Sequence, residues 1–179
     1  MEGILIKLPL PAVALFLALA ATGNLVASYG DTYRNTFGII AGIFFILLLI
    51  KIIKYSNKVR EELDNPVIAS VFPAFSMGIM LIATYIKPLV PSLGFIVWII
   101  GLILHIILIL YFSKKFLLNF NIKKVFPSWY IVYVGIVVGA VTAPAFDMAH
   151  IGRMVFWFGF ISYLILLPII FYREIKEKK

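Results

Sequence analysis

Long apolar stretches alternate with short polar segments along the whole chain. Six stretches lie at about residues 8–29, 36–56, 66–86, 92–112, 127–145 and 152–172. Each has roughly the ~20 residues that an α-helix needs to cross a bilayer. The apolar runs are continuous and do not alternate with polar positions, which disfavours a transmembrane β-barrel. We therefore predict an all-α integral membrane protein, with six transmembrane helices in a single domain over residues 1–179.

The six stretches repeat as pairs. Prolines open the odd-numbered stretches, at Pro9 and Pro11, then Pro66, then Pro127. The odd stretches hold many Ala, Gly, Ser and Thr residues, whereas the even ones are mostly Ile, Leu, Phe and Val. Small residues let helices pack closely or line a pathway, and bulky aliphatic residues suit lipid. The pattern predicts three hairpins, with odd helices inside and even helices outside, at about residues 8–56, 66–112 and 127–172.

The composition agrees with a membrane protein and disfavours an enzyme. With 63% hydrophobic and 13% charged residues, the chain has too few polar groups to cover a soluble domain of 179 residues. Because the chain has no cysteine, disulfides, thiolate metal sites and cysteine catalysis are excluded. We find no nucleophile–base pair, phosphate-binding loop or metal-ligand spacing. We predict no enzymatic activity, no cofactor and no metal.

The net charge of +8 is distributed as a topology signal, which argues against a nucleic-acid partner. Thirteen of the sixteen basic residues flank the same ends of the predicted hairpins, and three flank the other ends. The three are Arg34, Lys87 and Arg153. Basic residues close to membrane spans are retained in the cytoplasm. We expect both termini to be cytoplasmic, the protein to lie in the plasma or inner membrane, and the basic clusters to contact lipid.

Ionisable residues are nearly absent from the middle of the predicted spans. His105 is the one such residue near mid-membrane, and it lies among Leu104, Ile106 and Ile107 on an even, outer-type helix. We expect it to be hydrogen-bonded to a neighbouring helix and not to act as a proton relay. Proton-coupled carriers and cation channels usually place carboxylates at this depth, and this chain has none.

Several residues of the odd helices are candidates for lining a pathway. Pro73 lies within the third stretch and removes a helical hydrogen bond to the carbonyl of Ala69, which predicts a kink that either lines a cavity or serves helix packing. The same alternatives apply to Gly135 and Gly139. For a pore constriction we select Phe75, with packing between helices as its alternative. The full candidate set is Phe16, Thr22, Asn24, Ser70, Phe72, Pro73, Phe75, Ser76, Gly135, Gly139 and Thr142.

An ordered series of motifs in the odd helices resembles a known family. The motifs are Leu8-Pro9-Leu10-Pro11 through Ala20-Ala21-Thr22-Gly23-Asn24 to Ser28-Tyr29-Gly30, Asn65-Pro66-Val67 through Phe72-Pro73 to Met77-Gly78, and Pro127-Ser128-Trp129-Tyr130 through Val134-Gly135 to Pro144. This series is similar to the tellurite-resistance/dicarboxylate transporter family, which includes the plant slow-type anion channels. The resemblance covers essentially the whole chain.

The resemblance implies a pore of kinked odd helices in a homotrimer, in which each subunit passes small anions such as chloride, nitrate or dicarboxylates. Family members have ten helices in five hairpins, and this chain corresponds to the first three. The ninth helix, which carries the family's gating phenylalanine, has no counterpart, so no gate residue is transferred. We expect an anion channel or transporter whose pathway along helices 1, 3 and 5 is completed by further helices or a complementary chain. The alternative is a truncated or non-transporting assembly subunit of the same family.

The topology can be tested with single cysteines. In the variants Lys58→Cys and Lys87→Cys, the two thiols should react with a membrane-impermeant reagent from opposite faces, because the two positions flank opposite ends of the hairpins. The chain has no native cysteine to interfere. Labelling of both positions from one face would refute the hairpin scheme.

Overall fold

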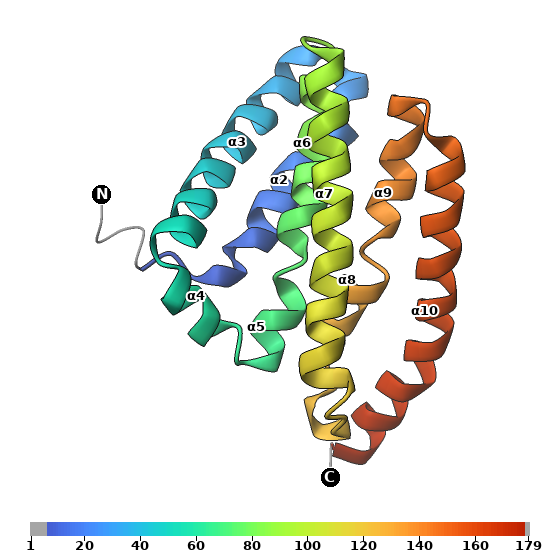
Figure 1. Ribbon diagram of the computed structural model, residues 1–179. Coiled ribbons are helices and arrows are strands. Elements are labelled where there is room, and N and C mark those ends of the chain that lie inside the picture. The colour runs from blue at the N-terminus through green and yellow to red at the C-terminus, as the bar shows by residue number, and fades with distance from the viewer. Residues whose placement is uncertain (1–6, 178–179) are drawn as a thin grey trace.

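The computed structural model describes residues 7–177, and this part of the chain contains helices and no strand. Figure 1 shows long helices running side by side, with short helices at one end of the bundle. The helices are α2 (Val13–Leu25), α3 (Asp31–Lys54), α4 (Ser56–Glu62), α5 (Pro66–Val71), α6 (Ala74–Ile86), α7 (Pro91–Phe112), α8 (Trp129–Tyr133), α9 (Val137–Thr142) and α10 (Ala149–Glu177). Short helical turns extend α2 at both ends, over Leu10–Ala12 and Val26–Tyr29, and lie at Ser113–Leu117, Ile122–Lys124 and Ala143–Phe146.

Five helical stretches in the described part are long and apolar enough to cross a membrane. They are the first stretch (Leu10–Tyr29), the second (Asp31–Lys54), the third (Pro66–Ile86), the fourth (Pro91–Leu117) and the sixth (Ala149–Lys176). The predicted span over residues 127–145 is not one continuous helix. It consists of α8 and α9, separated by residues 134–136, and we call residues 129–146 the fifth stretch. The count of six spans therefore stays a prediction.

Local sequence explains where several helices begin. Asn65 caps α5, since its Oδ1 accepts hydrogen bonds from the backbone N–H groups of Val67 (2.9 Å) and Ile68 (3.4 Å). Pro66 and Pro91 occupy the first positions of α5 and α7, where the missing N–H costs nothing. Gly30 makes the sharp turn between the first and second stretches with a φ of 134°, which other residues adopt only with strain.

The third stretch is the core of the bundle. In the third stretch, 67% of the most apolar 18-residue segment is buried inside the protein, whereas the corresponding share is 17% in each of the second and sixth stretches. Within this stretch α6 packs against α2 on one side, against α9 on another, and most extensively against α7. The first and fourth stretches are buried to similar extents, at 28% and 33%. These values do not separate odd helices from even ones, so the inside–outside order stays a prediction.

Glycines allow the first hairpin to approach the third stretch closely. A Cβ atom on Gly78 would lie 2.3 Å from Cε1 of Phe16, and one on Gly38 would lie 2.6 Å from Cε1 of Tyr85. No side chain fits at either distance. The rings of Phe16 and Tyr85 therefore occupy the space that these glycines leave, and each ring packs directly against the backbone of the neighbouring helix.

A buried ion pair fixes the start of the first stretch. The side chain of Lys51, at the end of α3, is 1% exposed, and its Nζ lies 2.6 Å from Oε1 of Glu62. The same ammonium donates to the backbone carbonyl of Leu8 (2.6 Å), and the backbone N–H of Leu10 donates to Oε2 of Glu62 (3.1 Å). The pair thus satisfies two backbone groups just before α2, where the chain has no helical partners for them.

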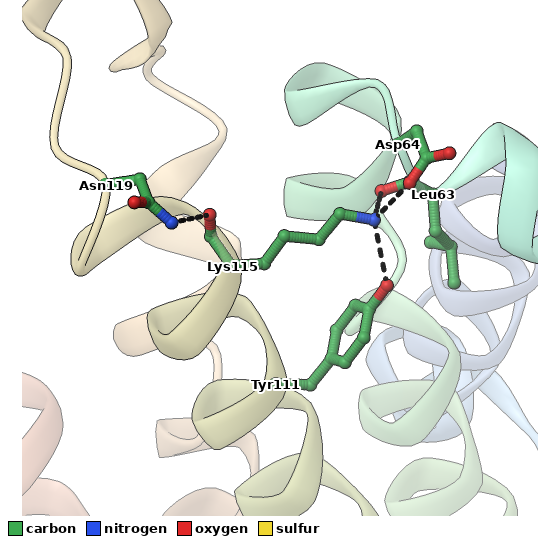
Figure 2. A network of polar contacts seen from close by, with 5 residues as sticks. All are labelled: Leu63, Asp64, Tyr111, Lys115 and Asn119. Carbon is green, nitrogen blue, oxygen red and sulfur yellow. Dashed lines mark hydrogen bonds and ion pairs between the residues drawn. The ribbon is translucent and has the colours of Figure 1, made fainter.

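A second, more exposed ion pair joins the end of α7 to the loop after α4 (Figure 2). Nζ of Lys115 lies 2.5 Å from Oδ1 of Asp64 and donates to the carbonyl of Leu63 (3.1 Å) and the hydroxyl of Tyr111 (3.1 Å). Asn119 donates back to the carbonyl of Lys115 (3.4 Å). The Asp64 side chain is 73% exposed, so solvent screens this pair.

The two ion pairs should differ strongly in their contribution to stability. Glu62→Ala leaves the buried Lys51 ammonium without its carboxylate, and breaking a buried pair on one side costs about 3–5 kcal/mol. Asp64→Ala is the matched control, because an exposed pair contributes about 1 kcal/mol or less. Thermal unfolding of both variants in the same detergent measures the difference. Equal losses would mean that Lys51 does not depend on Glu62.

Candidate functional site at two helix breaks

The third stretch is interrupted at Pro73. α5 ends at Val71 and α6 begins at Ala74. Across the junction the N–H of Phe75 donates to the carbonyl of Phe72 (2.9 Å), a tighter turn than that of an α-helix. Pro73 has no N–H to donate to the carbonyl of Ala69, so the normal helical bond is absent. The interruption predicted from Pro73 is thus confirmed, and it is buried within the bundle.

The fifth stretch is interrupted at Gly135. Before the break the turn is wide, since the N–H of Gly135 donates to the carbonyl of Tyr130, five residues back (3.0 Å). After it the turns are tight, since the N–H groups of Val137 and Val138 donate to the carbonyls of Val134 and Gly135, three residues back (3.0 Å each). A Cβ on Gly135 would lie 2.2 Å from the carbonyl oxygen of Ile131. Only glycine therefore fits at this break.

His105 joins the two breaks. From α7 its imidazole reaches between the third and fifth stretches, where it is fully buried. Nδ1 lies 2.8 Å from Oγ of Ser76, and Nε2 lies 3.1 Å from the carbonyl oxygen of Val132, one residue before the end of α8. The Ser76 hydroxyl in turn lies 2.7 Å from the carbonyl of Pro73. The expectation that His105 bonds to a neighbouring helix is confirmed, and the structure adds that it bonds to two.

The break at Gly135 also lies close against the side chain of Met77 on α6 and the imidazole of His105. A Cβ on Gly135 would lie 2.7 Å from Sδ of Met77 on α6 and 3.2 Å from Cε1 of His105. Within residues 7–177, no hydrogen bond or ion pair joins a charged side chain to His105, Ser76 or the break carbonyls. The two interrupted backbones thus form one polar centre inside an apolar bundle.

Three predicted pathway phenylalanines form an aromatic cluster with a fourth. The ring centroid of Phe75 lies 5.9 Å from that of Phe16, 6.2 Å from that of Phe72 and 5.7 Å from that of Phe45 on α3. Phe75 is 4% exposed, and Phe16 is fully buried. This arrangement is the helix packing that the sequence offered as the alternative to a constriction. A gating role for Phe75 stays a prediction.

A polar cluster lies at the other end of the first and third stretches. Asn24 Nδ2 donates to Oγ1 of Thr84 (3.0 Å), and the Arg34 guanidinium donates to the Thr84 carbonyl (2.8 Å) and to Oδ1 of Asn24 (3.4 Å). Arg34 also lies over the ring of Tyr85, 4.6 Å from its centroid. A pocket of about 500 Å³ opens beside Arg34 and Tyr85. Asn24 was a sequence candidate, whereas Thr84 and Arg34 were not.

The remaining candidates take part in contacts between or within helices. Ser70 and Ser128 lie 2.6 Å apart through their hydroxyl oxygens and link the starts of the third and fifth stretches. Thr142 accepts a hydrogen bond from Nε1 of Trp98 on α7 (2.8 Å). A Cβ on Gly139 would lie 3.1 Å from the side chain of Leu102, and the Thr22 hydroxyl donates to the carbonyl of Ala18 in its own helix (2.8 Å). Their pathway-lining role stays a prediction.

Comparison with known proteins identifies one family. A family model described as voltage-dependent anion channel matches residues 7–179. A search of curated proteins finds no match to the chain. The family match spans all three predicted hairpins, and it includes both helix breaks and the aromatic cluster.

The steric constraint at Gly135 can be tested by comparison with a glycine that has open space around it. Gly135→Ala should destabilise the protein by about 1–3 kcal/mol, since the added methyl overlaps the Ile131 carbonyl and Met77. Gly42→Ala in α3 is the matched control, because a methyl group added there would meet nothing within 4 Å. That change should be neutral or stabilise by up to about 1 kcal/mol, through helix propensity. Unfolding in detergent measures both, and a neutral Gly135→Ala would contradict the tight break.

Proposed function

Since this chain belongs to the voltage-dependent anion channel family, we propose that it provides a membrane pathway for small anions of the chloride, nitrate or dicarboxylate class. The pathway runs along the first, third and fifth stretches. The observation that carries the proposal is the meeting of two interrupted helices at one polar centre inside the bundle. Interrupted backbone inside a membrane protein is tolerated where protein covers it or where it lines a cavity.

The electrostatics of the described residues suit an anion. An anion that leaves water needs partial positive charges in place of its hydration shell, and N–H groups at helix starts supply them. α6 begins at Ala74, beside the polar centre, and so directs the positive end of its dipole there. No carboxylate bonds to this centre within residues 7–177, so no fixed negative charge there repels the ion. At one end of the bundle, the open pocket is lined by the Arg34 cation and also by the Asp31 carboxylate.

We further propose that other helices or additional copies of the chain enclose the pathway, in a homo-oligomer such as a trimer. α2, α6 and α9 follow one another along the bundle, and α2 and α9 each contact α6. Three inner helices in a row form an open arc and do not surround a pore. The thirteen-to-three distribution of basic residues supports cytoplasmic termini for a protein of the plasma or inner membrane.

The proposal predicts anion flux and a specific effect of Phe75. Liposomes that contain the purified chain should release chloride or nitrate down a concentration gradient. Phe75→Ala should raise this flux, because removing the ring widens the apolar space beside the Pro73 break. Phe112→Ala is the matched control: Phe112 is 1% exposed and packs against Phe116 (4.9 Å) and Trp129 (5.0 Å), so its loss leaves a comparable cavity elsewhere.

The outcomes of this experiment separate an anion channel or transporter from a non-transporting assembly subunit. Flux that rises with Phe75→Ala alone supports both the pathway and the constriction. Equal effects of the two substitutions would remove Phe75 as a constriction and leave its packing role. An oligomer of the chain that inserts and folds yet carries no anion would overturn a pathway formed by copies of this chain, in favour of a non-transporting assembly subunit.

A further inference from the structure

Three hydrogen bonds meet at the His105–Ser76 pair, and the number of available hydrogens decides how many can form together. The contacts are Nε2 to the Val132 carbonyl (3.1 Å), Nδ1 to Ser76 Oγ (2.8 Å) and Ser76 Oγ to the Pro73 carbonyl (2.7 Å). Each carbonyl can only accept. A neutral imidazole has one N–H and Ser76 has one O–H, which gives two hydrogens for three contacts.

The Val132 carbonyl determines the tautomer of the neutral ring. The Nε2–H tautomer gives this oxygen a donor and makes Nδ1 an acceptor, and it is favoured because the Pro73 carbonyl already accepts from the backbone N–H of Met77 (3.2 Å). The Ser76 hydroxyl is the one group placed to donate to Nδ1. When it does so, it no longer donates to the Pro73 carbonyl, and the break in the third stretch loses that bond.

We propose that His105 is a positioning residue for both helix breaks, held as the Nε2–H tautomer, and that proton uptake at Nδ1 turns the Ser76 hydroxyl from the ring to the Pro73 carbonyl. The proton comes from water, and the ring gains one positive charge. In the protonated state Nε2–H donates to Val132, Nδ1–H donates to Ser76, and Ser76 O–H donates to Pro73. Three hydrogens then serve three contacts.

The protonated ring would also attract an anion to the polar centre, and this part of the proposal rests on the proposed pathway. The imidazolium would lie between the breaks of the third and fifth stretches, where no carboxylate bonds to it within residues 7–177. A charge that lacks a fixed partner in an apolar bundle is costly, and a mobile anion alongside would offset that cost. Acidification should therefore favour an anion at the polar centre.

The other titratable groups on the elements around the ring are engaged elsewhere. On α8, the Tyr133 hydroxyl bonds to Ser113 (2.9 Å), and the Tyr130 ring pairs with Tyr163. On α6, the Tyr85 hydroxyl donates to the Ala20 carbonyl (2.7 Å), and on α7 the Tyr111 hydroxyl accepts from Lys115 (3.1 Å). α9 carries no titratable side chain. Proton uptake at the polar centre is thus assigned to His105.

Nitrogen NMR of the imidazole tests this directly and needs no transport. The chain has two histidines, and His150 lies exposed in the first turn of α10, so His150→Gln leaves one imidazole in the spectrum. With the protein in lipid nanodiscs at neutral pH, we expect a protonated Nε2 and an unprotonated Nδ1. On acidification both nitrogens should become protonated while the helices persist by circular dichroism. A protonated Nδ1 with a bare Nε2, an averaged pair of tautomers, or an Nδ1 that stays bare until the protein unfolds would overturn the proposal.

Variants of Ser76 and His105 complete the test. Ser76→Ala should shift the signal of the unprotonated Nδ1, Ser76→Thr should restore it, and Ser162→Ala should leave it unchanged, since the Ser162 hydroxyl donates to the Phe158 carbonyl within α10 (2.8 Å). An Nδ1 signal insensitive to Ser76→Ala would contradict the hydroxyl bond. In liposomes, His105→Gln should abolish a severalfold acid-induced rise in anion flux. Absence of all flux would count against the pathway, while the NMR result still decides the role of His105.

Discussion

Every backbone polar group inside a bilayer must find its partner within the protein, and this constraint governs the structure around the two helix breaks. Leaving such a group unpaired in hydrocarbon costs roughly several kcal/mol. A continuous helix meets the requirement by itself, but the third and fifth stretches do not. At the breaks, the His105 imidazole from α7 reaches the Val132 carbonyl, and the Ser76 hydroxyl from α6 adds a contact to the Pro73 carbonyl, which also accepts from the backbone N–H of Met77.

The same constraint applies at the bundle's charged end. Lys51 is fully buried, and Glu62 and the Leu8 carbonyl accept two of the three N–H bonds of its ammonium. Glu62 also accepts from the backbone of Leu10, so a single carboxylate serves a cation and a helix start. The outer pair of Lys115 and Asp64 has water as an alternative partner. Burial, more than the presence of opposite charges, separates a structural ion pair from a solvated one.

The features that could be predicted from the sequence are those set by residues close together along the chain. The membrane class, the helical fold and the family follow from hydropathy and from the ordered motifs, and the break at Pro73 follows from the chemistry of one ring. The break at Gly135 was not predicted, because a glycine in an apolar run is compatible with a continuous helix. Besides the Ile131 carbonyl four residues before it, Gly135 lies against Met77 and His105, which are distant in sequence. Arg34 and Thr84 were missed for the same reason, since they meet Asn24 only in three dimensions. No local pattern carries such pairings.

The contacts of the central hairpin have a consequence for how the chain is made. The hydrogen bonds between hairpins in residues 7–177 join the first to the second or the second to the third, through pairs such as Asn24 with Thr84 and Trp98 with Thr142. The larger helix contacts follow the same nearest-neighbour order. The second and third hairpins can therefore each pack against the hairpin made just before it, and the first has to wait only for the second. Synthesis and assembly proceed in step, and polar groups such as Asn24 and Arg34 depend on a partner hairpin for only a short interval.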